Sequence, residues 1–208
     1  MCILKEGMNF SDPVLRAAAA ALGGGASVLR IGGSDQNSLS YNLLDPAPMQ
    51  ACGCGHSCVL TAGTWRELTA FAASTGHRLL FGLSPDAEQA TALVAYAAQH
   101  NQSAWAYTYG NELNSAKLYA GYQQLRQLLD ALPPSARPLL AGPDVALARH
   151  APLPVALAGG DSTITGGLHW VVNFTAAVGT TLDAVAWYCR KREEEGGGGG
   201  GRGGREEK

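Results

Sequence analysis

An amide and a carboxylate stand side by side in this chain as Asn111 and Glu112, directly after Gly110. The preceding residues, Trp105 to Tyr109, have the aromatic and apolar character of a buried strand. Apolar residues at helical spacing follow from 116 to 132. In α/β enzymes, catalytic side chains gather where a strand ends ahead of a helix. An isolated Asn-Glu pair is more often solvated, so an active-site role for Glu112 depends on the rest of the chain.

Composition excludes several classes of partner. The chain has 208 residues, of which 46% are hydrophobic, as expected for one globular domain. Its net charge of −2 gives no electrostatic footprint for nucleic acid or an anionic membrane. No signal peptide or membrane span is recognisable in the sequence. Three N-glycosylation triplets, at Asn9, Asn101 and Asn173, favour the secretory pathway, although such triplets also arise by chance.

Three of the five cysteines lie in one short glycine-rich segment, as Cys52, Cys54 and Cys58, with His56 among them. Zinc binding would need four ligands, and this spacing is tighter than that of the usual zinc motifs. A loop disulfide formed in an oxidising compartment, or free thiols, is the simpler interpretation. We therefore predict no metal and no cofactor.

Strands and helices are expected to alternate along the chain. Apolar runs predict strands at 27–31, 79–83, 105–109, 138–142 and 182–187. Helical spacing and capping residues predict helices at 14–22, 64–74, 87–100, 116–132 and around 167–178. Asp12 is an expected N-cap, and Ser84-Pro85-Asp86 is an expected capping segment with Asp86 and Glu88 in the first turn. Thr64 and Glu67 form an expected capping box, and Gly76 is an expected helix end. Such alternation predicts an α/β fold with a parallel sheet.

The number of strands is small for a closed barrel. A (β/α)8 barrel typically needs about 250 residues, whereas five strands are expected here in roughly 190. We therefore expect residues 1–189 to form a partial barrel. Residues 190–208, rich in Glu and Gly, are expected to form a disordered tail.

Five motifs occur in the order and approximate spacing seen in the heparanase-like glycosidases of glycoside hydrolase family 79. The resemblance covers about Phe10 to Trp187. The motifs are Val28-Leu29-Arg30-Ile31-Gly32-Gly33-Ser34, Leu80-Phe81-Gly82-Leu83, Tyr109-Gly110-Asn111-Glu112-Leu113-Asn114-Ser115, Ala141-Gly142-Pro143-Asp144-Val145 and Leu182-Asp183-Ala184-Val185-Ala186-Trp187.

The resemblance implies a retaining (β/α)8 TIM-barrel glycosidase in which these strands are the second to the sixth. It assigns Glu112 as the general acid/base and places Asn111 near the 2-hydroxyl of the sugar. A carboxylic acid that protonates a leaving oxygen needs a raised pKa. A hydrogen bond to the 2-hydroxyl strengthens as the transition state gains oxocarbenium character.

Four further residues are expected substrate contacts on the same grounds. Gly32 and Gly33 would allow close backbone approach of a sugar. Asp144 and Arg149 lie in and after the expected Gly-Pro-Asp-Val loop, where Arg149 could pair with a uronic carboxylate or a sulfate. A solvated Arg149 remains the alternative, and Arg30 is equally an ion-pair partner inside the barrel or a substrate contact.

A retaining mechanism needs a second carboxylate about 5–5.5 Å from the acid. In the resembled family this nucleophile comes from the seventh strand, and no residue of this chain corresponds to it. Two hypotheses follow: a glycosidase of the endo-β-glucuronidase type acting on a glycan or proteoglycan, or a non-catalytic remnant that at most binds glycans. We expect no measurable glycoside hydrolysis by the chain itself. The family analogy also implies an extracellular, lysosomal or vacuolar site and allows peripheral membrane association.

Overall fold

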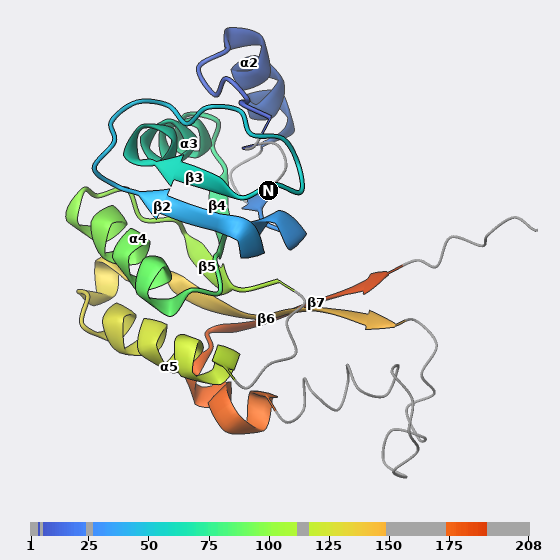
Figure 1. Cartoon of the computed structure of the whole chain (residues 1–208), viewed down its shortest axis with the longest axis vertical. Helices are drawn as coiled ribbons and strands as arrows, with labels where there is room; N and C mark the ends of the chain where they lie inside the picture. The colour runs from blue at the N-terminus through green and yellow to red at the C-terminus, as the bar shows by residue number, and fades with distance from the viewer. Residues whose placement is uncertain (1–3, 5, 24–26, 112–116, 149–173, 191–208) are drawn as a thin grey trace, which may run out of the picture.

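Five parallel strands form the main sheet, in the order β1-β4-β5-β6-β7 (Figure 1). The computed structural model describes residues 4, 6–23, 27–111, 117–148 and 174–190. The order is strictly sequential apart from two short strands outside this sheet. The strands are β1 (Val28–Ile31), β4 (Arg78–Leu83), β5 (Ala106–Tyr109), β6 (Leu139–Ala148) and β7 (Ala184–Arg190). The predicted α/β fold with a parallel sheet is confirmed.

Helices connect the strands and cover the sheet. They are α2 (Pro13–Leu22), α3 (Ala62–Ser74), α4 (Ala87–Gln99) and α5 (Lys117–Asp130), with a short helical stretch at 174–178. Because each of these crossovers joins neighbouring parallel strands, α3, α4 and α5 follow one another along the sheet (Figure 1). Their apolar faces are buried against it, as where Trp65 of α3 meets Phe81 of β4 edge to face at 5.0 Å.

Most of the expected helix ends are confirmed. The Asp12 carboxylate accepts hydrogen bonds from the backbone N–H groups of Val14 at 2.7 Å and Leu15 at 3.0 Å. Asp86, expected in the capping segment and the first turn, is the N-cap itself: its carboxylate accepts a hydrogen bond from the Gln89 backbone N–H at 3.1 Å. Such side-chain acceptors satisfy the N–H groups that the first helical turn leaves unpaired. Gly76 follows α3 with a φ of 74°, a conformation that glycine adopts without strain.

The capping box expected at Thr64 is wrong. Helix α3 begins three residues earlier, and its N-cap is Thr61, whose hydroxyl accepts a hydrogen bond from the Thr64 backbone N–H at 3.2 Å. The Thr64 hydroxyl instead accepts one from the Met49 backbone N–H at 2.7 Å. The reason is that a strand runs directly into α3 at Thr61, which leaves no loop in which Thr64 could begin the helix.

A second, two-stranded parallel sheet lies within the segment expected to be a long loop. Its strands are β2 (Leu39–Asn42) and β3 (Cys58–Thr61), and the 3-10 helix η1 (Ser34–Ser38) precedes β2. The Tyr41 backbone N–H donates to Gln89 of α4 at 2.8 Å, and the Tyr41 hydroxyl accepts from the Ser84 backbone N–H at 2.8 Å. These bonds attach the small sheet to the start of α4.

Strand β6 is longer than predicted. It continues to Ala148, so the backbone of Asp144 belongs to a strand and not to the expected loop. Its pairing with β7 shifts register between Gly142 and Val145, where the Gly142–Pro143 peptide bond is cis. The remainder of the helix expected around 167–178 and the tail at 191–208 lie outside the described residues, so the predicted domain boundary stays a prediction.

Candidate functional site

Asn111 lies just beyond the carboxyl end of β5, in the middle of the sheet. The Gly110 backbone N–H donates to Leu83 O at 3.0 Å, which extends the pairing of β5 with β4 by one residue. Gly110 has a φ of 65°, which turns the chain away from the strand direction. Asn111 follows this turn and is only 3% exposed. The predicted position of this amide at a strand end is therefore confirmed.

The side chain of Asn37, from η1, pairs with the backbone of Asn111. Asn37 Nδ2 donates to Asn111 O at 2.8 Å, and Asn37 Oδ1 accepts from the Asn111 backbone N–H at 2.9 Å. The amide side chain thus offers one donor and one acceptor, as a neighbouring strand would. The preceding residue, Gln36, does the same between β1 and β4: its Oε1 accepts from Gly33 N at 3.1 Å and its Nε2 donates to Leu83 O at 3.1 Å.

The side-chain oxygen of Asn111 is an acceptor that no described residue uses. Asn111 Oδ1 is buried and has no hydrogen-bond partner among the residues that the structure describes. A buried polar atom without a partner costs about 1–3 kcal/mol, so such atoms call for an explanation. A hydroxyl donor from a bound molecule would satisfy this oxygen.

The other expected site residues fall into two groups. Gly32 and Gly33 are described and lie at the end of β1, beside Gln36. A β-carbon on Gly32 would lie 3.0 Å from Gln36 Oε1, and Gly33 has a φ of 105° as it opens η1. Both glycines thus serve the turn that brings Gln36 and Asn37 over the sheet. Glu112 and Arg149 lie outside the described residues, and of Asp144 only the backbone is described.

Two tyrosine hydroxyls bind the segment that follows β4. The Tyr109 hydroxyl donates to Pro85 O at 2.5 Å, next to Ser84, whose N–H donates to Tyr41. Burial raises the pKa of Tyr109 to about 12, and the nearby Asp86 carboxylate adds to the rise. Burial also raises the pKa of the Tyr41 phenol well above its usual value. Both hydroxyls therefore stay protonated at neutral pH, as their hydrogen-bonding roles require.

Tyr122 of α5 inserts its hydroxyl between β5 and β6. The hydroxyl accepts from the Tyr109 backbone N–H at 3.2 Å and donates to Ala141 O at 3.3 Å. A β-carbon on Gly142 would overlap with this hydroxyl. Beyond the two paired positions, Ala106 with Leu139 and Tyr107 with Leu140, a side chain therefore takes over the role of the backbone ladder.

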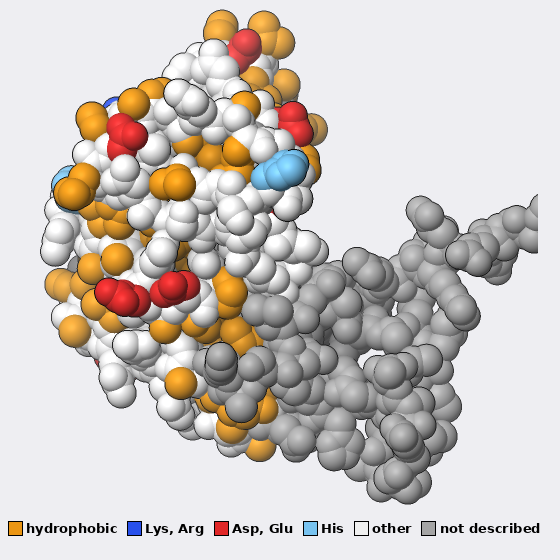
Figure 2. Space-filling view, viewed as in Figure 1, with side chains coloured by type: hydrophobic (Ala, Val, Ile, Leu, Met, Phe, Trp, Pro, Cys, Tyr) orange, Lys and Arg blue, Asp and Glu red, His pale blue; other side chains and the backbone are white. Residues whose placement is uncertain are grey.

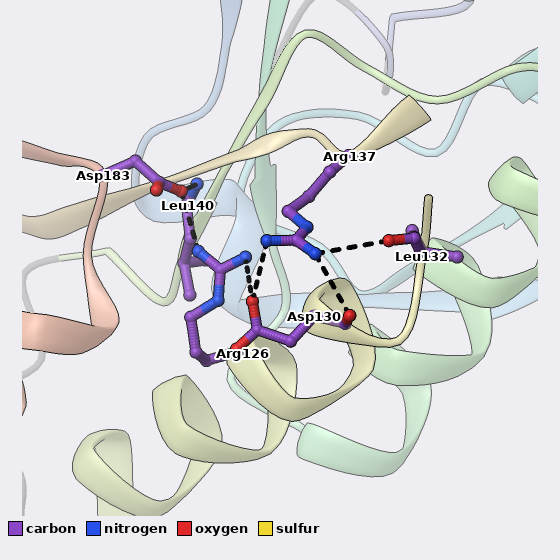
Figure 3. A network of polar contacts seen from close by, with 6 residues as sticks. All are labelled: Arg126, Asp130, Leu132, Arg137, Leu140 and Asp183. Atoms are coloured by element: carbon purple, nitrogen blue, oxygen red, sulfur yellow. Dashed lines mark hydrogen bonds and ion pairs between the residues drawn. The ribbon is translucent and has the colours of Figure 1, made fainter. Parts of the chain in front are cut away.

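A cluster of charges lies at the opposite, amino edge of the sheet (Figure 3). Arg126 of α5 forms ion pairs with Asp183 at 2.9 Å and with Asp130 at 3.0 Å, and Arg137 pairs with Asp130 at 3.2 Å. Asp183 also accepts from the Leu140 backbone N–H at 2.8 Å. This cluster ties the end of α5 to the beginnings of β6 and β7, far from the strand ends that carry Asn111.

The cysteine-rich segment contains a disulfide between Cys52 and Cys58, as one of the predicted alternatives had it. Disulfides persist in oxidising compartments. Within the described ranges, no three His, Cys, Asp or Glu side chains are grouped as metal ligands would be. The Gly55 backbone N–H, inside the disulfide loop, donates to the Asp35 carboxylate at 2.8 Å and so connects the loop to η1.

On the face shown in Figure 2, the described acidic side chains stand at separate places rather than in one patch. None of the described helices has both the length and the apolar character that crossing a membrane requires.

No family model matches the chain, and neither does any curated protein.

The sequence does not predict the roles of Gln36 and Asn37, whose side chains hydrogen-bond to Gly33 and to Asn111, respectively. Their one visible signal is their position, a few residues after a strand that ends in two glycines.

Proposed function

We propose that this chain carries the acid/base half of a glycoside hydrolase site of the heparanase-like, retaining (β/α)8 class, with the nucleophile missing. In this proposal Glu112 is the general acid/base, and Asn111 binds the 2-hydroxyl of the sugar at the subsite next to the cleaved bond. The observation that carries the proposal is Asn111 itself, an amide fixed at the carboxyl end of a central strand, whose buried acceptor oxygen has no partner among the described residues. A sugar hydroxyl is a donor of the required kind.

Strand order supports the barrel. In doubly wound sheets the order reverses at a switch point, and ligands bind there. The described sheet has no reversal: β1, β4, β5, β6 and β7 are neighbours in chain order, as consecutive strands of a barrel are. In barrels the ligand site is built at the carboxyl ends of the strands, which is where Asn111 lies.

A second candidate function is glycan binding without hydrolysis. The described side chains that hydrogen-bond around Asn111 are amides, and amides bind sugar hydroxyls but do not attack a glycosidic bond. In this case the same strand-end site would hold a β-glucuronide without cleaving it.

Two measurements on the purified chain test these proposals. Titration with methyl β-D-glucuronide, followed by NMR, should show saturable binding that Asn111→Ala weakens about tenfold or more, a loss of roughly 1.4 kcal/mol. Asn111→Asp keeps a side-chain acceptor and should bind more tightly than Asn111→Ala. Gln124→Ala, an exposed amide on α5, is the matched control and should bind like the wild type. A wild-type chain that binds no glucuronide would contradict both functions.

Release of 4-nitrophenol from its β-glucuronide separates the two. We expect binding without measurable release, because no residue of the sequence corresponds to the nucleophile. Release that disappears in Glu112→Gln would instead establish the chain as an enzyme in its own right.

A further inference from the structure

The 3-10 helix η1 carries two consecutive amide side chains, Gln36 and Asn37, which we call the amide bridge. Gln36 connects Gly33 with Leu83, at the ends of β1 and β4. Asn37 connects to Asn111, beyond the end of β5. The amide bridge therefore adds side-chain connections at the carboxyl edge, beside the ends of three neighbouring strands.

The bond pattern at Asn37 requires an asparagine. One planar group must donate to Asn111 O and accept from Asn111 N, which only a primary amide does at neutral pH. Aspartate keeps the acceptor and loses the donor, alanine loses both, and glutamine would move the amide outward by one methylene.

Asn111 needs a restraint of this kind. It follows Gly110, whose φ of 65° and missing side chain leave the backbone with more conformational freedom than any other residue would. Asn37 binds the N–H on one side of the Asn111 α-carbon and the carbonyl on the other. That carbonyl belongs to the peptide bond leading into Glu112.

The amide bridge is itself held rigidly. Gln36 is fully buried, and its amide lies over Gly82 of β4, where a β-carbon would overlap with it. Asp35 accepts the hydrogen bond from Gly55 in the disulfide loop. Asn37 is therefore presented to Asn111 from a fixed support.

We propose that Asn37 is a positioning residue for glycoside binding: by fixing the Asn111 backbone on both sides, it sets where the Asn111 side-chain oxygen meets the sugar. This inference rests on the proposed function. It adds a residue that has no direct role in the chemistry.

The test compares Asn37→Asp and Asn37→Ala with Asn42→Asp, a matched change at an exposed asparagine at the end of β2. Two readouts are needed: hydrogen exchange of the Asn111 backbone N–H, and the dissociation constant for methyl β-D-glucuronide. Asn37→Ala should speed the exchange and weaken binding, each at least about tenfold. Asn42→Asp should change neither.

Asn37→Asp separates positioning from a general structural role. It keeps the acceptor for Asn111 N–H, so exchange stays slow, but at neutral pH it cannot donate to Asn111 O and should bind the glucuronide less tightly. Near pH 4 the new carboxyl becomes protonated and regains a donor, so its affinity should approach that of the wild type at the same pH.

Unchanged exchange and affinity in Asn37→Ala would overturn the proposal, as would faster exchange with unchanged affinity. If that variant does not fold, the pH profile of Asn37→Asp decides, and a defect that is the same at pH 4 and pH 7 contradicts positioning. A wild-type chain that binds no glucuronide refutes the proposed function, while the exchange measurement, which needs no ligand, still decides whether Asn37 fixes Asn111.

Discussion

The two edges of the main sheet are built from different polar groups. At the carboxyl edge, neutral amides and tyrosine hydroxyls make the connections, through Gln36, Asn37 and Tyr109. At the amino edge the connections are ion pairs, centred on Arg126 and Asp183 (Figure 3). Both edges tie helices and loops to strand ends, but the physical basis differs.

The two edges also differ in solvent exposure, which determines how much a small movement costs at each. The Asp130 and Asp183 side chains are 54% and 34% exposed, although the Arg126 side chain is 14% exposed, so water and salt reach the ion pairs from the carboxylate side and screen them. Gln36 is fully buried and Asn111 is 3% exposed, so a lost hydrogen bond there leaves a polar group with no replacement partner. The amino edge therefore tolerates movement, whereas the carboxyl edge fixes atoms in place.

The largest loss of folding stability is expected from a substitution that crowds the amide bridge. In Gly82→Ala the new methyl group would occupy the space of the Gln36 amide, so the free energy of unfolding should fall by about 1–3 kcal/mol. Urea unfolding measures it. Gly179→Ala is the control, because a β-carbon there meets no atom within 4 Å. If Gly82→Ala is as stable as the wild type, Gln36 does not sit over β4.

The second-largest effect is expected at alkaline pH, which should lower the free energy of unfolding through Tyr109 at the carboxyl edge. The phenol of Tyr109 has a pKa of about 12 in the folded chain and about 10 when unfolded. Above pH 10 the unfolded chain loses this proton while the folded chain keeps it, so the unfolded state binds fewer protons and stability falls as pH rises. Below about pH 10 the phenol is protonated in both states, so it does not make the free energy of unfolding depend on pH.

The measurement is urea unfolding at several pH values from 8 to about 11, where one such phenol contributes up to roughly 1.4 kcal/mol per pH unit. Tyr109→Phe should show a shallower decline than the wild type. An unchanged decline would mean that Tyr109 is not responsible for it.

The smallest effect is expected at the amino edge. Arg126→Met keeps the apolar stem and removes the charge, so it should cost about 1 kcal/mol or less in low salt. In about 1 M salt, where charges are screened beyond roughly 3 Å, the difference from the wild type should nearly vanish. A cost that is several times larger and independent of salt would refute the contrast between the two edges.

The features that the sequence predicts correctly are local. Asp12 and Asp86 cap the helices that follow them, and the strands correspond to short apolar runs. Thr64 fails as a cap because Thr61, three residues earlier, offers the same local signal at the end of an unforeseen strand. That strand, β3, and its partner β2 lie in a segment rich in Asn, Pro, Gly and Cys, whose composition is typical of a loop, so neither short strand stands out from it.

The candidate site was predicted only in part, for a similar reason. Asn111 is recognisable because it follows a strand. The role of Asn37 depends on a partner 74 residues away in the sequence, and local sequence patterns do not predict such a long-range contact.

The main sheet consists of two blocks of paired strands, and the Tyr122 hydroxyl lies at the boundary between them. On one side β1, β4 and β5 pair over four residues at each step, and on the other β6 and β7 pair along most of their length. Between them the backbone ladder is two residues long and is continued by one phenol. Proteins open locally where few buried bonds must break. The line between β5 and β6 is therefore where this sheet should first come apart, so that each block exchanges its amide hydrogens as a separate cooperative unit.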